Sequence, residues 1–190
     1  EFTVAGFNLF RFFDTLDDPA LANGSGGEPI LTATALNNRL GKTAEAICSY
    51  LKTPDIIGVV EVENIGVLTQ LADTINNGQV PTGNAVPACN TAPGYVPYLV
   101  EGNDVGGIDV GFLVSSKIVD EGTTPRVEVL DVVQENDGEL LVNPDSSTST
   151  LNDRPTLRLQ AVIHNGNGAS YPVTVMINHL RSLNDVNTTT

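Results

Sequence analysis

The sequence predicts an α+β fold, a layered α/β sandwich in which two packed, mainly antiparallel sheets are flanked by helices. Strand-like and helix-like segments alternate in the first part of the chain, whereas later strand-like segments follow one another without helices between them. In addition, the Gly-rich stretch "GSGGEP" lacks the Lys-Ser/Thr of a P-loop, which argues against a doubly wound nucleotide-binding fold.

The first part of the chain is predicted to run β-α-β-α. Residues 3–10 are rich in aromatic and β-branched residues, which is typical of a strand. Apolar residues recur at spacings of three and four over residues 34–52, which predicts a helix that ends at Thr53-Pro54. The apolar run at 56–62 predicts a buried strand, and the apolar repeat over residues 67–75 predicts a second helix.

The second part is predicted to consist of strands. The strand-like segments lie at 95–101, 107–115, 126–133, 156–163 and 172–180. Apolar and polar residues alternate in "TLRLQAVI", as in a half-buried antiparallel strand, and "HNGNGAS" carries Asn-Gly turn signals. We therefore expect a hairpin over residues 156–178. The stretch "DSSTST" at 145–150 is predicted to be a flexible loop.

The charge and the cysteine content of the chain indicate which ligands it can bind and in which compartment it is found. The 190 residues carry 23 acidic and nine basic side chains, so the formal net charge is −14. Such a surface repels polyanions, and contact with a phosphate would need a bound cation. No apolar run reaches the roughly 20 residues that span a bilayer, so no membrane span is expected. Cys48 and Cys89 predict a disulfide and a secreted or extracytoplasmic location. The sequons at Asn23 and Asn187 leave glycosylation open.

Four polar residues interrupt or end strand-like segments: Asn8, Glu61, Arg154 and His179. Each has an ordinary structural explanation on its own. Glu61 can lie at a sheet rim, Asn8 can hold a neighbouring backbone, and His179 can be a hydrogen-bonded histidine at the end of a sheet. Arg154 can pair with its neighbour Asp153 at the surface.

Together the four residues suggest a site for phosphoester hydrolysis. Carboxylate and amide oxygens suit Mg²⁺, Mn²⁺ or Ca²⁺, which makes Asn8 and Glu61 candidate metal ligands. An arginine can bind a phosphate through two parallel hydrogen bonds, and a histidine can donate to a phosphoryl oxygen, so Arg154 and His179 are candidate catalytic residues. No Cys/His spacing or HExxH motif indicates zinc.

Five segments, "FNLFRFFDT", "DIIGVVEVEN", "LVEGNDVGGIDVGFLV", "LNDRPTLRL" and "VTVMINHLRSLND", resemble in this order the N-terminal half of the endonuclease/exonuclease/phosphatase family, especially its secreted bacterial extracellular nucleases. The resemblance implies that Asn8 and Glu61 help to hold the catalytic divalent metal. It also implies that His179 binds or helps to protonate the scissile phosphate, and that Arg154 faces the phosphate. Glu63 is expected to share a strand face with Glu61, as a further ligand or as a cap of the following helix.

The resemblance runs from about residue 3 to residue 186, and it implies that residues 1–190 form the N-terminal half of a catalytic domain. The family's second half carries a Gly-Asp-x-Asn motif and a terminal Ser-Asp-His motif, and the sequence contains neither. We therefore expect a second chain or segment to complete the fold. The leading interpretation is a secreted metal-dependent phosphodiesterase with nucleic acid as its substrate. The alternatives are a phosphatase or phospholipase of the same family, and a catalytically silent binding or assembly module.

Overall fold

The structure, a computed structural model, describes residues 2–18, 28–83, 85–104 and 106–180. The sequons at Asn23 and Asn187 and the last residues of the resemblance lie outside this part of the chain. The elements are β1 (Val4–Phe12), α1 (Ala33–Glu45), the π-helical turn η1 (Ala46–Tyr50), β2 (Ile56–Val62), α2 (Ile65–Asn77), β3 (Tyr95–Leu99), β4 (Asp109–Ser115), β5 (Val127–Glu135), β6 (Leu140–Val142), β7 (Thr148–Thr150), β8 (Thr156–His164) and β9 (Ser170–Ile177).

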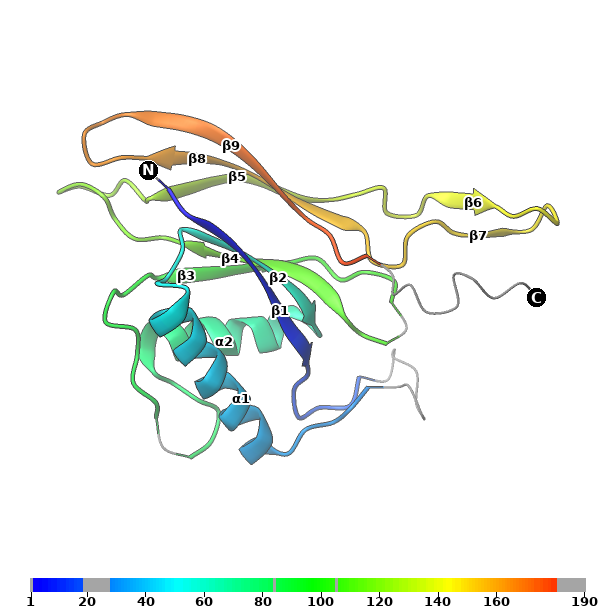
Figure 1. The fold of residues 1–190 in the computed structure, drawn as a ribbon, viewed down its shortest axis with the longest axis horizontal. Helices are drawn as coiled ribbons and strands as arrows, with labels where there is room; N and C mark the ends of the chain where they lie inside the picture. The colour runs from blue at the N-terminus through cyan, green and yellow to red at the C-terminus, as the bar shows by residue number, and fades with distance from the viewer. Residues whose placement is uncertain (1, 19–27, 84, 105, 181–190) are drawn as a thin grey trace.

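The elements form three layers, which confirms the predicted α+β sandwich (Figure 1). A four-stranded sheet of order β1-β2-β4-β3 lies between the two helices and a three-stranded antiparallel sheet of order β5-β8-β9. Only β1 and β2 pair in parallel in the larger sheet. Both α-helices cover the same face of this sheet, so helices flank the pair of sheets on one side (Figure 1).

The helices begin and end where local sequence signals place them. The side chain of Thr32 accepts a hydrogen bond from Ala35 N, 3.2 Å away, which caps the start of α1. Asn64 caps α2 in the same way by accepting from Val67 N at 2.8 Å. Helix α2 ends at Gly78, which adopts φ 69°, a left-handed conformation that glycine adopts without steric cost.

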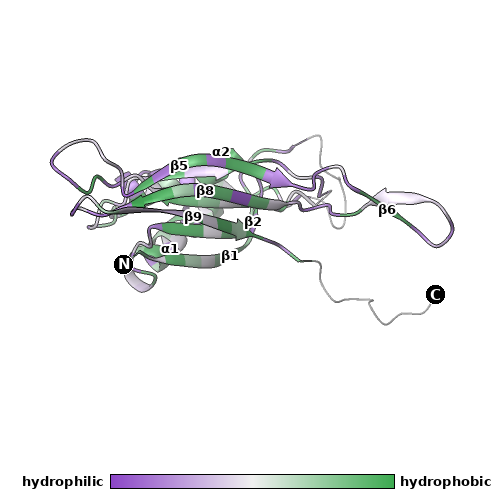
Figure 2. Cartoon of the chain, turned by 90° about the horizontal axis from the view of Figure 1, so that it is seen from above, coloured by the Kyte–Doolittle hydropathy of each residue, from purple (hydrophilic) through white to green (hydrophobic). Residues whose placement is uncertain are grey.

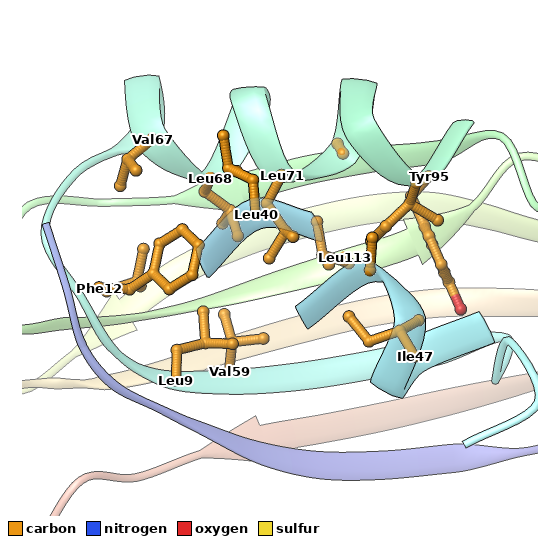
Figure 3. Packing of buried hydrophobic residues seen from close by; sticks show 14 of the residues in the cluster. Leu9, Phe12, Leu40, Ile47, Val59, Val67, Leu68, Leu71, Tyr95 and Leu113 are labelled. Atoms are coloured by element: carbon orange, nitrogen blue, oxygen red, sulfur yellow. The ribbon is translucent and has the colours of Figure 1, made fainter. Parts of the chain in front are cut away.

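Apolar side chains of the helices and of the larger sheet form the first core. Leu40, Leu68 and Leu71 from the helices meet Val59 and Leu113 from the sheet, and all five are fully buried (Figure 3). Burying a side chain of this size stabilises the fold by about 1.5–3 kcal/mol. The apolar stripes that predicted the helices therefore fix these helices onto the sheet.

The second core fills the space between the two sheets. Ile56, Phe112 and Val114 point from the larger sheet toward Leu157 and Leu159 of β8. Gly58 leaves room for the side chain of Ile177 between the sheets, because a Cβ at Gly58 would lie 3.0 Å from the Cδ1 atom of Ile177. The sandwich therefore brings the end of β9 over β2.

One predicted loop is in fact part of a hairpin. Residues 148–150 of "DSSTST" form β7 and pair with β6, against the prediction of a flexible loop. The arm, which we define as residues 136–151, extends away from the sandwich in both views (Figures 1 and 2). The prediction was wrong because short exposed strands without a buried face lack the apolar alternation on which strand assignment depends.

The predicted disulfide joins Cys48 of η1 to Cys89, with 5.5 Å between the two Cα atoms. It closes a loop of sequence separation 41, which in the chain-entropy account stabilises the folded state by about 4 kcal/mol. Cys89 is 7% exposed, so the bond lies largely inside the protein. None of the helices in the described ranges is long and apolar enough to cross a bilayer.

Candidate functional site

The four residues singled out from the sequence lie together at one end of the sandwich. Asn8 Nδ2 donates a hydrogen bond to Glu61 Oε1 at 2.8 Å, and His179 Nε2 lies 3.5 Å from the same oxygen. The other ring nitrogen of His179, Nδ1, lies 3.3 Å from a guanidinium nitrogen of Arg154. Segments more than a hundred residues apart in the chain thus meet in one continuous line of contacts.

A bulge in β2 turns Glu61 toward this line. Ile57 and Val59 pack on the helix side of the sheet, and regular alternation would place Glu61 there too. Instead, the register shifts between Val60 and Val62, and Val62 takes the position on the helix side. Glu61 has φ 62°, a strained conformation for a residue with a Cβ and one that clusters at functional sites. The bulge therefore aims the carboxylate at Asn8 and His179.

A second irregularity holds the end of β1 against Glu61. Phe10 and Arg11 also have positive φ angles, 57° and 54°. The guanidinium of Arg39 on α1 donates to the carbonyl oxygens of Leu9, Phe10 and Arg11, at 3.0 Å for Leu9 and 2.7 Å for Arg11. The exposed Arg11 N–H then donates to Glu61 Oε2 at 3.0 Å. The sequence does not identify Arg39 as part of the site, because no local pattern shows which carbonyl groups its guanidinium contacts.

Asp104 forms an ion pair with Arg154. Asp104 was not identified from the sequence as part of the site. Its Oδ1 lies 3.3 Å from both Nε and a terminal nitrogen of the Arg154 guanidinium. The other oxygen of Asp104 accepts from Gly106 N and Ile108 N, so the carboxylate is fixed by its own loop. Acidic residues crowded into the Gly-rich stretch "EGNDVGGID" are the signal that could have pointed to it.

His179 is arranged to be neutral. Its pKa is lowered, first by burial and then by the positive charge of Arg154, while Glu61 acts in the opposite direction. Because a guanidinium only donates hydrogen bonds, Nδ1 of His179 must act as the acceptor toward Arg154. The proton of the neutral ring is then on Nε2, which faces Glu61. The imidazole thus offers one N–H donor at the point where Asn8 and Glu61 meet.

The donor set at this point suits a hard divalent cation. Asn8 and Glu61 supply one amide and one carboxylate. The 2.8 Å contact between them joins the amide nitrogen of Asn8 to Glu61 Oε1, and Asn8 Oδ1 accepts from Phe10 N at 2.6 Å. A metal bound by both side chains would therefore replace this hydrogen bond and require Asn8 Oδ1 to turn toward Glu61. Mg²⁺ commonly takes only one or two protein carboxylates and completes its shell with water and substrate phosphate. The two residue types thus suit the metal that the sequence suggested, whereas the hydrogen bond between them does not place two oxygens side by side.

A second acidic cluster lies beside the first and contains Glu63. Ligand oxygens of Asp14, Glu28 and Glu63 lie within 4.8 Å of one another, an arrangement that can hold a metal ion. Burial, followed by a hydrogen bond with Glu28, raises the pKa of Glu63 to about 8. Glu63 lies directly after the last residue of β2, and its Oε2 accepts from Asp14 N at 2.7 Å. Of the two roles expected for Glu63, the cap of α2 belongs to Asn64 instead.

Asp109, at the start of β4, is a third buried carboxyl group at this end. Its Oδ1 accepts from Gly102 N at 2.8 Å, and the residue is 6% exposed. Burial raises its pKa to about 8, and a hydrogen bond with Glu101 and the charges of Glu101 and Asp104 act in the same direction. Carboxyl groups thus gather around the candidate site, and the raised pKa values of Glu63 and Asp109 keep these two mainly protonated at neutral pH.

Comparisons with known proteins do not assign the chain to a family. No family model, no curated protein and no solved structure matches it. The description of the site therefore depends on the geometry of its own residues.

Proposed function

We propose that the chain forms part of a metal-dependent phosphodiesterase that hydrolyses nucleic acid. The observation that carries the proposal is the line of contacts Asn8–Glu61–His179–Arg154. It joins a ligand pair for a hard cation to a neutral N–H donor and a guanidinium, which are the groups that phosphoester hydrolysis needs.

Each residue has a distinct role in this proposal. Asn8 and Glu61 hold Mg²⁺, or Mn²⁺ or Ca²⁺ in its place, and the ion when bound offsets charge on a phosphoryl oxygen. Arg154, held by Asp104, faces a second phosphoryl oxygen through its remaining guanidinium hydrogens. His179 donates its Nε2 proton toward the phosphate, because its Nδ1 is engaged by Arg154.

The surplus of acidic groups supports a role for the cation. The whole chain has a formal net charge of −14, which protonation of the two buried carboxyl groups of Glu63 and Asp109 offsets only in small part. A polyanionic substrate is repelled by such surroundings unless a cation lies between them. Binding of a nucleic acid phosphate is therefore expected to depend on the metal.

The disulfide supports a secreted or extracytoplasmic location for this enzyme. Disulfides persist mainly in oxidising compartments, and Cys48–Cys89 is largely buried within the fold. We further propose that another chain or segment completes the catalytic site, because the second pair of catalytic motifs implied by the resemblance does not occur in the sequence.

The test is hydrolysis by the native protein that contains this chain. Single-stranded and duplex DNA and RNA are incubated with the protein in Mg²⁺, in Mn²⁺, in Ca²⁺ and in a chelator. Cleavage that requires the metal and is lost in Glu61→Gln supports the proposal. Hydrolysis of phosphate monoesters or phospholipids without nucleic acid cleavage would favour a phosphatase or phospholipase. Absence of any metal-dependent turnover would favour a silent binding module.

A further inference from the structure

A cavity of about 280 Å³ opens beside Arg154 and His179, where the arm leaves the sandwich. Asn136, Asn152 and Asn178 line it together with these two residues. Its volume lies near the lower end of the range of about 300–1,000 Å³ for small-molecule sites. The cavity therefore has room for one small group next to the proposed phosphate position.

The polar side chains around this cavity offer more free hydrogen-bond donors than free acceptors, because, of its three asparagines, only Asn136 has an amide oxygen without a partner among the residues that the structure describes. Asn152 Oδ1 accepts from Arg154 N at 3.2 Å, and Asn178 Oδ1 accepts from the hydroxyl of Thr156. Both amide oxygens are thus engaged, while within the described residues both Nδ2 groups lack a partner. Arg154 adds a guanidinium, which can only donate. The cavity is consequently suited to a ligand that presents hydrogen-bond acceptors.

Apolar side chains complete the lining. Leu151 and Leu180 border the cavity and are 53% and 82% exposed. Flat, partly apolar groups such as nucleobases bind between apolar side chains when they leave the base stack. Phosphate or sugar groups would gain little from these two leucines, whereas a base would bury apolar area against them.

We propose that this cavity binds the base next to the reacting phosphate, and that it prefers guanine. This inference rests on the proposed phosphodiesterase function, because the cavity adjoins the two residues assigned to the phosphate. The N7 and O6 atoms of guanine are adjacent acceptors and match a lining of donors, whereas the corresponding edge of adenine pairs an acceptor with a donor. A base can enter the cavity only when it is unpaired, so the substrate is single-stranded or locally opened nucleic acid.

The test measures binding rather than turnover. The native protein is titrated calorimetrically, in the presence of Mg²⁺, with 5′-GMP, 5′-AMP, ribose 5-phosphate and inorganic phosphate. We expect 5′-GMP to bind roughly tenfold more tightly than 5′-AMP, since a good donor–acceptor match discriminates between bases by about this much. Ribose 5-phosphate and inorganic phosphate should bind more weakly than either nucleotide.

Single substitutions then test whether the preference for 5′-GMP arises in this cavity. Asn178→Leu keeps the volume of the side chain but removes its donor, and it should reduce the preference for 5′-GMP without changing the affinity for inorganic phosphate. Asn38→Leu, the same change on the exposed face of α1, serves as the control. Equal affinity for all four probes, or no binding of any, overturns the inference. A guanine preference without metal-dependent hydrolysis would support the cavity and contradict the proposed catalytic function.

Discussion

The two ends of the sandwich carry the same kinds of charged pair but combine them differently. At the Asp55 end, defined by Asp55, Arg126, Glu128 and His164, an Arg–Asp pair and a His–Glu pair have closest contacts of 3.0 and 2.9 Å. At the Glu61 end, defined by Glu61, Asp104, Arg154 and His179, the corresponding pairs have closest contacts of 3.3 and 3.5 Å. The residue types alone therefore do not distinguish a site from a structural contact.

The Asp55 end links the two sheets. Asp55 precedes β2 and accepts from Thr3 N at 2.8 Å, which ties the start of β1 to β2. Arg126 precedes β5 and donates to both oxygens of Asp55, to the carbonyl of His164 at the end of β8 and to the side chain of Asn165. These contacts use backbone groups and a charge pair of opposite sign, so this end is a structural junction.

The Glu61 end differs because its two pairs touch each other. Arg154 faces the ring of His179 instead of a second carboxylate, so two groups that both can carry positive charge are neighbours. The backbone bends at Glu61, and two buried carboxyl groups nearby, Glu63 and Asp109, have raised pKa values. What separates a candidate site from a structural junction here is an irregular backbone beside a group of buried carboxyl groups, not the presence of ion pairs.

The strongest test of this difference replaces the glutamate of each His–Glu pair by glutamine, one pair at a time. We expect Glu61→Gln to abolish metal-dependent hydrolysis, because the amide keeps the shape but lacks the charge that a hard cation requires. Glu128→Gln, at the Asp55 end, should leave turnover unchanged. The measurement is the initial rate in saturating Mg²⁺, with circular dichroism to check folding. Full activity of Glu61→Gln would remove Glu61 from the metal site.

The two histidines give the next test. His179→Ala should lower turnover about 10²- to 10⁴-fold, the range expected when a catalytic histidine that donates to the phosphate is lost, with little change in the Mg²⁺ concentration for half-maximal activity. His164→Ala is the matched control, since the two side chains are 16% and 20% exposed, and it should keep full turnover. If His179→Ala regains activity at high Mg²⁺, His179 is a metal ligand and not a proton donor.

Substitution of Arg126 and of Arg154 should affect stability and function differently. Arg126→Leu is expected to lower the free energy of unfolding by about 2–3 kcal/mol, because it leaves Asp55 without its cation in a site that is mostly buried. Arg154→Leu should cost only about 1–2 kcal/mol, since Asp104 keeps its two backbone donors, yet it should remove phosphate binding. Urea unfolding and phosphate titration measure the two effects. Equal losses of stability would contradict the assignment of the Asp55 end as the structural junction.

The sequence was sufficient to predict the layered fold and to single out the four residues that meet at the candidate site. Apolar periodicity depends on burial, and the buried faces of β2, α2 and β8 carry it clearly. Asn8, Glu61, Arg154 and His179 stood out because polar groups at the ends of apolar strands need partners. The order of the strands then brought them together, although their chemical roles remain predictions.

The remaining features depend on contacts that no local pattern records. The bulge at Glu61 occurs in "GVVEVE", where neither glycine nor proline marks an irregularity at residue 61. Arg39 acts on carbonyl groups about thirty residues earlier in the chain, so the sequence shows no link between them. The arm formed by β6 and β7 has no buried face, and Asp104 lies in a loop whose path depends on neighbouring strands.

The smallest expected effect concerns the pH dependence of stability at the Glu61 end. Burial raises the pKa of Asp109 from 3.8 to about 8, whereas in the unfolded chain the group loses its proton near the ordinary value. Between these values the folded state binds more protons than the unfolded state, so the free energy of unfolding falls as the pH rises through this window. One group contributes at most about 1.4 kcal/mol per pH unit, and Glu63 acts in the same direction.

Asp109→Asn removes the titrating group while keeping its size, so the free energy of unfolding should fall less steeply between pH 5 and pH 8, by up to about 1 kcal/mol per pH unit. Urea unfolding at several pH values in a chelator measures the slope. Glu139→Gln, on the exposed arm, should keep the slope of the unsubstituted protein. An unchanged slope in Asp109→Asn would mean that its carboxyl group is already ionised in the folded state, and that the surplus negative charge at the Glu61 end is relieved without protonation there.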